Sequence, residues 1–161
     1  MIKIRNTNNL IELFVDQFNL QKDKKKNFLS SLKENKKNFS WLEVNNCIAV
    51  LAKELKKYVN KGDRCLIISE NRPEWLIADL SIMLSSSITV PAYTTYTEKD
   101  YEFIIDDCKP TIIFVSDNEQ FSKVKRILKN KNFIKKVYSF ENLSQPSDSD
   151  YENINEIFNL I

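Results

Sequence analysis

Two patterns of apolar residues alternate along this chain: short continuous runs, and segments in which apolar residues recur at helical spacing. Continuous apolar runs predict buried strands at 65–68, 88–92, 112–115 and 136–140, because strands covered on both faces have no polar side. Between these runs, apolar residues at helical spacing predict helices at 72–85, 97–107 and 118–129. The strand starts recur about every 24 residues, the length of one strand, one helix and two short loops. This pattern predicts an α/β fold with a mainly parallel sheet flanked by helices.

The first forty residues follow a less regular pattern. Leu10, Leu13, Phe14 and Phe18 fall near helical spacing and predict a short opening helix. The charged run 22–26 is typical of a solvated link. Residues 28–40 fit either a short helix or a small β-hairpin around the polar turn 34–37. A longer amphipathic helix is predicted after Ser40, and Gly62 is expected to end it with a positive φ.

The predicted helix starts share one spacing of polar residues. Ser40 and Glu43 form a capping box, in which each side chain accepts the other residue's backbone N–H. The same spacing recurs at Thr97 and Asp100, Asp117 and Gln120, and Asn71 and Glu74. We therefore expect Asn71 to cap its helix and Glu74 to complete the box, with Pro73 tolerated in the first turn.

Three clusters of polar side chains are candidates for chemistry. Arg72 and the segment 93–97 follow predicted strand ends, where α/β proteins often bind ligands, but a helix start and a polar loop explain them equally. Asp106 and Asp107 are neighbours on a helix, so they point apart and do not form a catalytic pair. The basic run 123–136 is typical of the solvated face of an amphipathic helix.

Composition removes several classes of function. The chain has 161 residues, of which 42% are hydrophobic and 29% charged, as in a globular domain. Its net charge of +2 gives no electrostatic case for nucleic acid as a partner. It has no histidine, which excludes histidine-based triads and histidine metal ligands. A single glycine excludes both the Walker loop and the dinucleotide-binding G-x-G-x-x-G turn.

The cysteines and the apolar segments indicate where the protein works. Cys47, Cys65 and Cys108 are widely spaced, which fits buried thiols in a reducing compartment and excludes a zinc site. No segment has the length and apolar character of a signal peptide or a membrane span. We expect a cytoplasmic protein without a transmembrane segment, and a peripheral contact with a membrane surface stays open.

Four segments resemble a known enzyme family. They are FSWLEV (39–44), KGDRCLIISENRPEWLIADLSIM (61–83), ITVPAYTTYT (88–97) and FIIDDCKPTIIFVSD (103–117). In this order they resemble the N-terminal region of the adenylate-forming acyl-CoA synthetases, most closely the long-chain fatty-acid–CoA ligases. The family-signature residues, which we expect to be structural, are Trp41, Gly62, Asp63, Asn71, Arg72, Pro73, Glu74, Trp75 and Pro91. The resemblance also favours the hairpin for residues 28–40.

The resemblance implies a reaction in two steps. A fatty acid carboxylate attacks the α-phosphate of ATP to give an acyl-adenylate and pyrophosphate, and coenzyme A then displaces AMP. Mg²⁺ offsets the phosphate charge. The family's Ser/Thr/Gly-rich phosphate loop, its ribose-binding motif and its catalytic lysine have no counterpart in this sequence. No catalytic, cofactor-binding or metal-binding residue of the family therefore maps onto this chain. Ser86-Ser87 replaces the family's Gly-Ala, and if that glycine serves either tight packing or a positive φ, Ser86 is expected to add strain.

These observations predict the organisation of the chain. Residues 1–143 are expected to form part of the ligase's large N-terminal domain, with a helix and hairpin at 10–40 and repeated β-α units at 41–143. Residues 144–161 are expected to be a linker and a truncated element that includes Ile154, Ile157 and Phe158. The expected role is an inactive scaffold whose partner is the remainder of the ligase or a second copy. Two alternatives stay open: a stand-alone interaction module, and a flavodoxin-like nucleotide or flavin binder, for which no phosphate-binding turn is visible.

Overall fold

Helices and strands alternate through most of the computed structural model, which describes residues 7–31, 38–129, 131–143 and, by backbone alone, 151–153. The elements are α1 (Leu10–Leu20), β1 (Asn27–Leu29), β2 (Phe39–Ser40), α2 (Trp41–Leu55), β3 (Arg64–Ile68), α3 (Pro73–Leu84), β4 (Ile88–Ala92), α4 (Glu98–Cys108), β5 (Ile112–Val115), α5 (Asn118–Leu128), β6 (Lys136–Ser139) and β7 (Tyr151–Asn153). The predicted strands 88–92 and 112–115 are confirmed at both ends, and the other predicted elements of the β-α units differ by one or two residues.

The main sheet has five strands in the order β4-β3-β5-β6-β7, and every pairing between them is parallel. The predicted parallel sheet is confirmed. Parallel neighbours need a crossover connection, and α3, α4 and α5 provide three of them. The chain first adds β4 on one side of β3 and then crosses back to add β5 on the other side.

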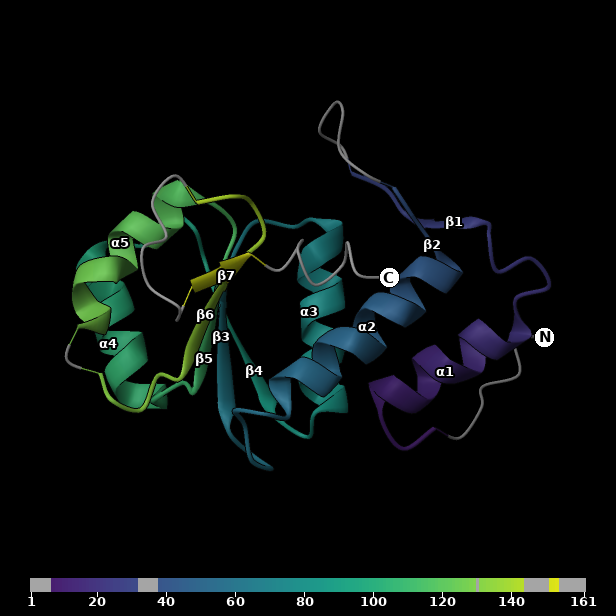
Figure 1. Cartoon of the computed structure of the whole chain (residues 1–161), viewed down its shortest axis with the longest axis horizontal. Coiled ribbons are helices and arrows are strands. Elements are labelled where there is room, and N and C mark those ends of the chain that lie inside the picture. Colours follow the sequence, from purple (N-terminus) through teal and green to yellow (C-terminus); the bar gives the residue numbers. More distant parts are fainter. Residues whose placement is uncertain (1–6, 32–37, 130, 144–150, 154–161) are drawn as a thin grey trace.

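This reversal of direction distributes the helices over both faces of the sheet. Crossovers between parallel strands are right-handed, so a change of direction moves the helix to the opposite face. Figure 1 shows α2 and α3 on one face and α4 and α5 on the other. The three layers that result bury β3, β5 and β6 on both sides, as their continuous apolar runs predicted, whereas Ile88 and Pro91 of the edge strand β4 are exposed.

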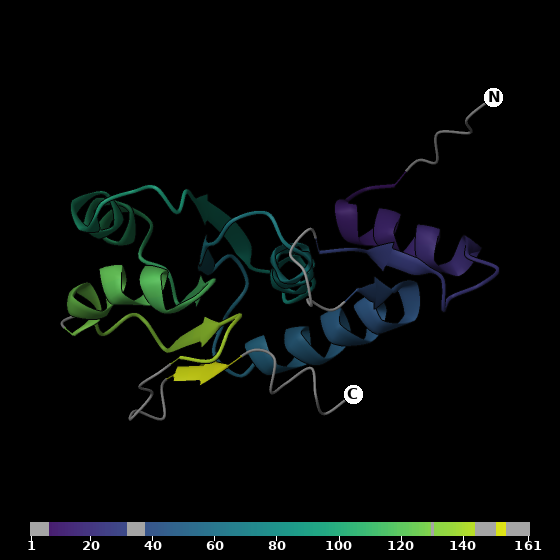
Figure 2. The ribbon, with the colours of Figure 1, turned by 90° about the horizontal axis from the view of Figure 1, so that it is seen from above.

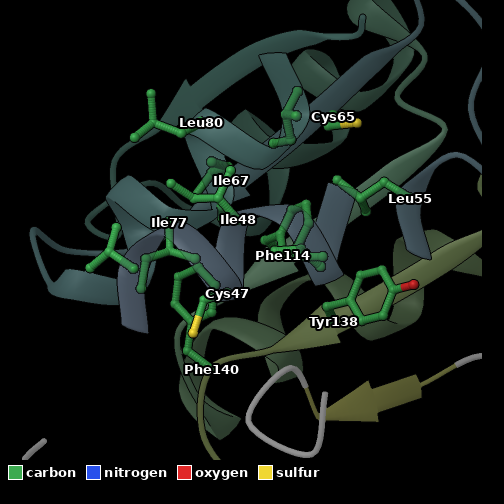
Figure 3. Close-up of a cluster of buried hydrophobic side chains, with 14 of the residues drawn as sticks. Cys47, Ile48, Leu55, Cys65, Ile67, Ile77, Leu80, Phe114, Tyr138 and Phe140 are labelled. Atoms are coloured by element: carbon green, nitrogen blue, oxygen red, sulfur yellow. The ribbon is translucent and has the colours of Figure 1, made fainter. Parts of the chain in front are cut away.

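The strands β3, β5 and β6 contribute alternate side chains to two separate cores. In β3, Cys65 and Ile67 pack under α2 and α3, whereas Leu66 and Ile68 pack under α4 and α5. The first core is drawn in Figure 3, where Phe114 and Tyr138 stack with ring centroids 5.4 Å apart. The two cores hold the sheet rigidly between the helices, so the loops at its edges have fixed starting points.

The N-terminal elements form an extension beside α2, seen at one end of the molecule in Figure 2. β1 and β2 pair antiparallel, which confirms the predicted hairpin, although the turn 34–37 lies outside the described residues. Aromatic rings hold the extension together. Trp41 stacks on Phe28 at 3.7 Å between centroids and on Phe14 at 6.1 Å. Trp41 therefore packs in the aromatic cluster of this extension.

Two expectations about helix ends are wrong. Asn71 does not cap α3: the N-cap is Arg72, in extended conformation and without a side-chain cap bond. Pro73 explains this, because a proline at the first helical position forces the residue before it out of the helical region. Gly62 does have a positive φ of 86°, but α2 ends at Leu55, so Gly62 belongs to the turn that leads into β3.

Two further observations concern the ends of predicted segments. The capping boxes at Ser40 and Thr97 are both confirmed, and Asp117 caps α5 by accepting the N–H of Gln120. β7 lies inside the segment that was predicted as a linker and truncated element. The remainder of that segment, with Ile154, Ile157 and Phe158, lies outside the described residues.

Candidate functional site

The candidate site is the edge of the sheet where β3, β4 and β5 end. The parallel strands present their carboxyl ends there, followed by the segments 69–72, 93–97 and 116–117. The order β4-β3-β5 makes β3 the point where the chain reverses direction. Ligands of open α/β sheets bind at this kind of switch point, because the two loops that leave it diverge to opposite faces.

Arg72 is the most heavily paired side chain at this edge. Its Nε donates to Glu74 Oε2 at 2.9 Å, and its Nη1 donates to Glu141 Oε1 at 3.2 Å. The Glu70 carboxylate lies 3.5 Å from the same Nη1, and the guanidinium covers the ring of Phe140 at 5.7 Å. Only 7% of the Arg72 side chain is exposed. The guanidinium thus ties the start of α3 to the segment that follows β6.

The neighbouring carboxylates keep the Arg72 guanidinium ionised. Burial acts to lower the pKa of Arg72, but the hydrogen bond and charge of Glu74, helped by Glu70 and Glu141, outweigh burial and raise it. The pairing directs the cation toward protein carboxylates. The Arg72 guanidinium is therefore engaged by carboxylates at the start of α3 and after β6.

A cavity of about 420 Å³ opens beside the end of β3. Its walls come from three segments: Glu70 and Asn71 after β3, Trp75 on α3, and Pro91 and Tyr93 at the end of β4. Tyr93 is 72% exposed, so an aromatic face borders the opening. The size is within the range of small-molecule sites, about 300–1,000 Å³. The segment 93–97 is therefore a wall of a cavity as well as the link to the cap of α4.

Contacts from α4 and α5 hold the segment 93–97 in place. The hydroxyl of Tyr101 lies 2.8 Å from the carbonyl oxygen of Tyr93 and 3.0 Å from Gln120 Oε1. Lys123 Nζ donates to the carbonyl oxygen of Thr94 at 2.9 Å. Burial raises the pKa of Tyr101 to about 12, so this phenol stays protonated and keeps donating. Because these bonds go to backbone carbonyl oxygens, they hold the backbone of the segment 93–97 in place.

A second, shallower hollow of about 520 Å³ lies on the other side of Thr94. Glu70, Asp117 and Glu119 supply carboxylates there, and Lys123 supplies the one ammonium among the lining residues that the structure describes. That ammonium is engaged, because it also pairs with Glu119 Oε1 at 3.1 Å. Both hollows at this edge are therefore poor in cations that could hold phosphate.

Other reactive side chains lie away from this edge. Cys47 and Cys65 are buried free thiols, and burial, with the charge of Asp63, raises the pKa of Cys65 to about 12. Burial also raises the pKa of Cys108. Asp106 pairs with Lys131. Within the described ranges, no cluster of side chains could hold a metal ion, and no helix is long and apolar enough to cross a membrane.

Comparison with known proteins identifies the family. The family model for the AMP-binding enzymes matches residues 16–157, which is most of the chain. The chain belongs to the AMP-binding enzyme family. The resemblance inferred from the sequence motifs is thereby confirmed, and the family is that of the adenylate-forming acid–CoA ligases, which use ATP.

Curated relatives of this AMP-binding chain include fatty acyl-CoA synthetases. Long chain acyl-CoA synthetase 3 of Arabidopsis thaliana is 29% identical over 63% of this chain and 15% of its own length. Fatty acyl-CoA synthetase A of Dictyostelium discoideum is 28% identical over 81% of this chain and 20% of its own length. The chain thus spans at most a fifth of the length of these two relatives.

Solved structures confirm the fold of this family member. The anthranilate CoA ligase AuaEII, solved in complex with anthranoyl-AMP, superposes with a TM-score of 0.79 at 18% identity. The match covers 94% of this chain and 28% of that one. At this identity the match shows the arrangement of helices and strands and carries no information about ligands of this chain.

The family-signature residues occupy three separate places. Asn71, Arg72, Pro73, Glu74, Trp75 and Pro91 lie at the carboxyl edge. Gly62 and Asp63 lie at the opposite edge, where the Gly62 N–H donates to the carbonyl oxygen of Ser86 and Asp63 Oδ2 accepts the N–H of Asn60. Trp41 lies in the N-terminal aromatic cluster. The structure thus separates residues that the motifs place in one group.

Four residues of the site were missed by sequence reasoning. Glu141 lies 69 residues from Arg72, and no local pattern pairs them. Tyr101 and Gln120 resemble ordinary buried residues of amphipathic helices, and Lys123 resembles a solvated charge. A signal for Tyr101 did exist, because a buried tyrosine hydroxyl needs a hydrogen-bond partner. The sequence contains nothing that identifies the partner as the carbonyl of Tyr93.

Proposed function

We propose that this chain forms the first part of the large domain of a long-chain fatty-acid–CoA ligase and serves there as a scaffold. Residues 1–143 form the domain portion. Within it, residues 10–40 are the helix and hairpin, and residues 41–143 are the repeated β-α units. Residues 144–161 are the linker and the start of a truncated element. The scaffold supports the acyl-adenylate site of the whole enzyme. We assign none of the family's catalytic residues to this chain.

One observation carries the proposal that the chain is inactive alone. Its single glycine, Gly62, precedes β3 and so lies at the edge of the sheet opposite the candidate site. Phosphate loops need glycines at the carboxyl end of a strand, where the backbone must approach the phosphates closely. The cations at the candidate edge, Arg72 and Lys123, are already paired with carboxylates. The described residues at this edge therefore do not fit ATP, Mg²⁺ or coenzyme A.

The groups that hold these ligands belong to the remainder of the ligase. We assign to that remainder the phosphate loop, the ribose-binding motif and the catalytic lysine, which makes it the partner of this chain. The fatty acid is a substrate of the assembled enzyme. We place the enzyme in the cytoplasm, without nucleic acid as a partner.

An activity assay tests the catalytic part of the proposal. The purified chain, given ATP, Mg²⁺, palmitate and coenzyme A, is expected to release neither pyrophosphate nor AMP. Fatty acyl-CoA synthetase A of Dictyostelium, to which the chain is 28% identical, serves as the positive control. Sustained AMP formation by the chain alone would overturn the proposal.

A segment exchange tests the scaffold role directly. Residues 41–143 replace the matching segment of the Dictyostelium enzyme, and acyl-CoA formation is measured. A chimera that folds and forms acyl-CoA supports the scaffold role, because this segment then carries the site in its new context. The same chimera with Arg72→Met is the matched control and is expected to lose activity together with stability. A folded but inactive chimera counts against the scaffold role.

Exposed apolar side chains support a second candidate, a non-catalytic interaction module. On α1, Leu10 is 56% exposed, Leu13 40% and Leu20 51%, which leaves one stripe of the helix uncovered. A module of this kind binds an apolar dye and self-associates in solution. The coding DNA beyond codon 161 separates the two candidates: an open frame that continues into a Ser/Thr/Gly-rich loop supports the ligase, and a stop codon supports the module.

A further inference from the structure

The segment 93–97 separates the two hollows at the carboxyl edge of the sheet. Thr94 lines both of them, the cavity of about 420 Å³ on one side and the hollow of about 520 Å³ on the other. Tyr93 lines the first hollow, and Thr95 lines the second. The position of this segment therefore determines the shape of both hollows.

Two side chains bind adjacent carbonyl groups of this segment. The Tyr101 hydroxyl has one proton, and the carbonyl oxygen of Tyr93 at 2.8 Å is the nearer of its two acceptors. Lys123 Nζ donates to the carbonyl oxygen of Thr94 at 2.9 Å. Gln120 Oε1 lies 3.0 Å from the Tyr101 hydroxyl and 3.5 Å from Lys123 Nζ. Gln120 thus links the two contacts into one network.

Burial makes this network a firm support. Tyr101 is fully buried, and Gln120 is 4% exposed. Tyr101 also belongs to the core that lies between the sheet and the helices α4 and α5. A buried hydroxyl has no water to replace a lost partner, so its bond to the Tyr93 carbonyl is costly to break. The backbone of the segment therefore stays fixed relative to α4, although the side chain of Tyr93 itself is largely exposed.

The network is not needed to begin α4. The capping box of Thr97 and Asp100 already satisfies the first turn of that helix. Tyr101 and Lys123 bind carbonyl groups that precede the cap by three or four residues, in the part of the segment that lines the hollows. The contacts thus act on the wall of the candidate site and add nothing to the cap.

We propose that Tyr101 and Lys123 are positioning residues of the ligase site, which hold the wall between the two hollows where a substrate meets it. The inference rests on the proposed function, because the substrate is that of the assembled enzyme. Both residues act through the carbonyl groups of Tyr93 and Thr94. A small displacement of such a wall lowers the affinity for the substrate that contacts it and leaves the other substrates unaffected.

Hydrogen exchange in this chain tests the support of the segment. The Tyr96 N–H donates to the carbonyl oxygen of Tyr93 at 3.3 Å, so its exchange rate reports on the turn that Tyr101 holds. Tyr101→Phe removes the hydroxyl and keeps the ring, and we expect this N–H to exchange about fivefold faster. Tyr58→Phe removes the same atom beside the other core and should leave the rate unchanged. Equal rates in the unsubstituted chain and both variants would overturn the proposal.

Steady-state kinetics of the segment-exchange chimera tests the effect on substrate. Tyr101→Phe and Lys123→Met are expected to raise the KM of the same single substrate, among ATP, fatty acid and coenzyme A, by about fivefold. Lys129→Met removes an exposed charge just after α5 and should leave every KM unchanged. A loss of kcat without a change in any KM is the result of a general folding defect and would contradict the positioning role.

The outcomes separate this inference from the proposed function. An inactive but folded chimera counts against the scaffold role and against the positioning role that rests on it. An active chimera whose Tyr101→Phe and Lys123→Met variants keep every KM retains the scaffold role and rejects the positioning role. An active chimera in which both variants raise the KM of one substrate supports both.

Discussion

Helices α3 and α4 both begin after a strand of the main sheet, yet they begin in different ways. At α4, Asp100 Oδ2 accepts the N–H of Thr97 at 2.8 Å, and Thr97 Oγ1 accepts the N–H of Asp100 at 3.4 Å. At α3, the N-cap Arg72 makes no side-chain cap bond, and Glu74 pairs with the Arg72 guanidinium instead. Local hydrogen bonds make one start, and a buried ion network makes the other.

The difference shows what each start does for the molecule. The α4 start is complete within four residues and is exposed, so it stabilises its own helix. The α3 start reaches Glu141 in the segment after β6, so it also fixes the position of that segment. Loss of the α4 cap should lower the free energy of unfolding by the contribution of one helix cap. Loss of the ion network at the α3 start should lower it further, because buried charges are left without a counter-ion.

Arg72→Met gives the largest effect that this comparison predicts. The substitution keeps an unbranched side chain but removes the cation, so the half-buried carboxylates lose their counter-ion. We expect a loss of about 3 kcal/mol in the free energy of unfolding, measured in urea. Arg126→Met, at an exposed position on α5, is the matched control and should cost under about 0.5 kcal/mol.

Arg72→Lys sharpens the same test. Lysine keeps the charge but cannot contact Glu74 and Glu141 with separate planar N–H groups. It should recover less than about half of the stability that Arg72→Met loses. If Arg72→Met and Arg126→Met have equal cost, the ion network contributes nothing to stability.

Alanine substitutions at the two cap positions should separate the helix starts. Thr97→Ala removes a side chain that accepts the N–H of Asp100, and a loss of about 1 kcal/mol in the free energy of unfolding is expected. Asn71→Ala removes a side chain that caps nothing, and a loss under about 0.5 kcal/mol is expected. Urea unfolding measures both. Equal losses would mean that Asn71 does cap α3 in solution.

A substitution just after the C-terminal end of α3 is expected to increase stability by a smaller amount. Ser86 has a φ of 66°, a left-handed conformation that costs a residue with a Cβ more than it costs glycine. Ser86→Gly should raise the free energy of unfolding by about 0.5 kcal/mol after the added freedom of the unfolded chain is counted. Ser85 has a φ of −80° and donates to the carbonyl of Ile82, so Ser85→Gly should destabilise. A loss in both variants would contradict strain at Ser86.

The smallest effect concerns acid pH at the α4 start. Hydrogen bonds from the backbone and the side chain of Thr97 lower the pKa of Asp100 below its ordinary 3.8. A lowered folded-state pKa adds stability above the unfolded value, and that contribution is lost as the pH falls below 3.8. Asp100→Asn should flatten this part of the stability curve. Identical curves for the two proteins below that pH would show that the cap carries no charge effect.

The sequence specifies short-range structure well in this chain. Ser40, Thr97 and Asp117 cap the predicted helices, because each makes its bond within three residues. The apolar strands place their alternate residues in two cores as the two-sided burial requires. Ser86 has a positive φ of 66°, so of the two reasons considered for the family's glycine, tight packing and a positive φ, the second is present here.

Side-chain pairing over long distances could not be predicted from the same patterns. Asn71 has the sequence spacing of a helix cap, but Pro73 shifts the helix start to Arg72. The Arg72 guanidinium then forms an ion pair with Glu74. The partner Glu141 becomes a neighbour of Arg72 only after β6 has joined the sheet. The cavity beside β3 likewise requires two loops that only the folded sheet brings together.

The strand order also determines how this sheet can assemble during synthesis. β3 leaves the ribosome first among its strands, and β4 and β5 each pair with it directly. β6 then pairs with β5, and β7 pairs with β6. Among the strands that the structure describes, each therefore meets a partner that has already been translated, and none is inserted between two earlier ones. Domains that are completed from the N-terminus in this way can bury apolar strands while translation continues, which shortens the time in which those strands could aggregate.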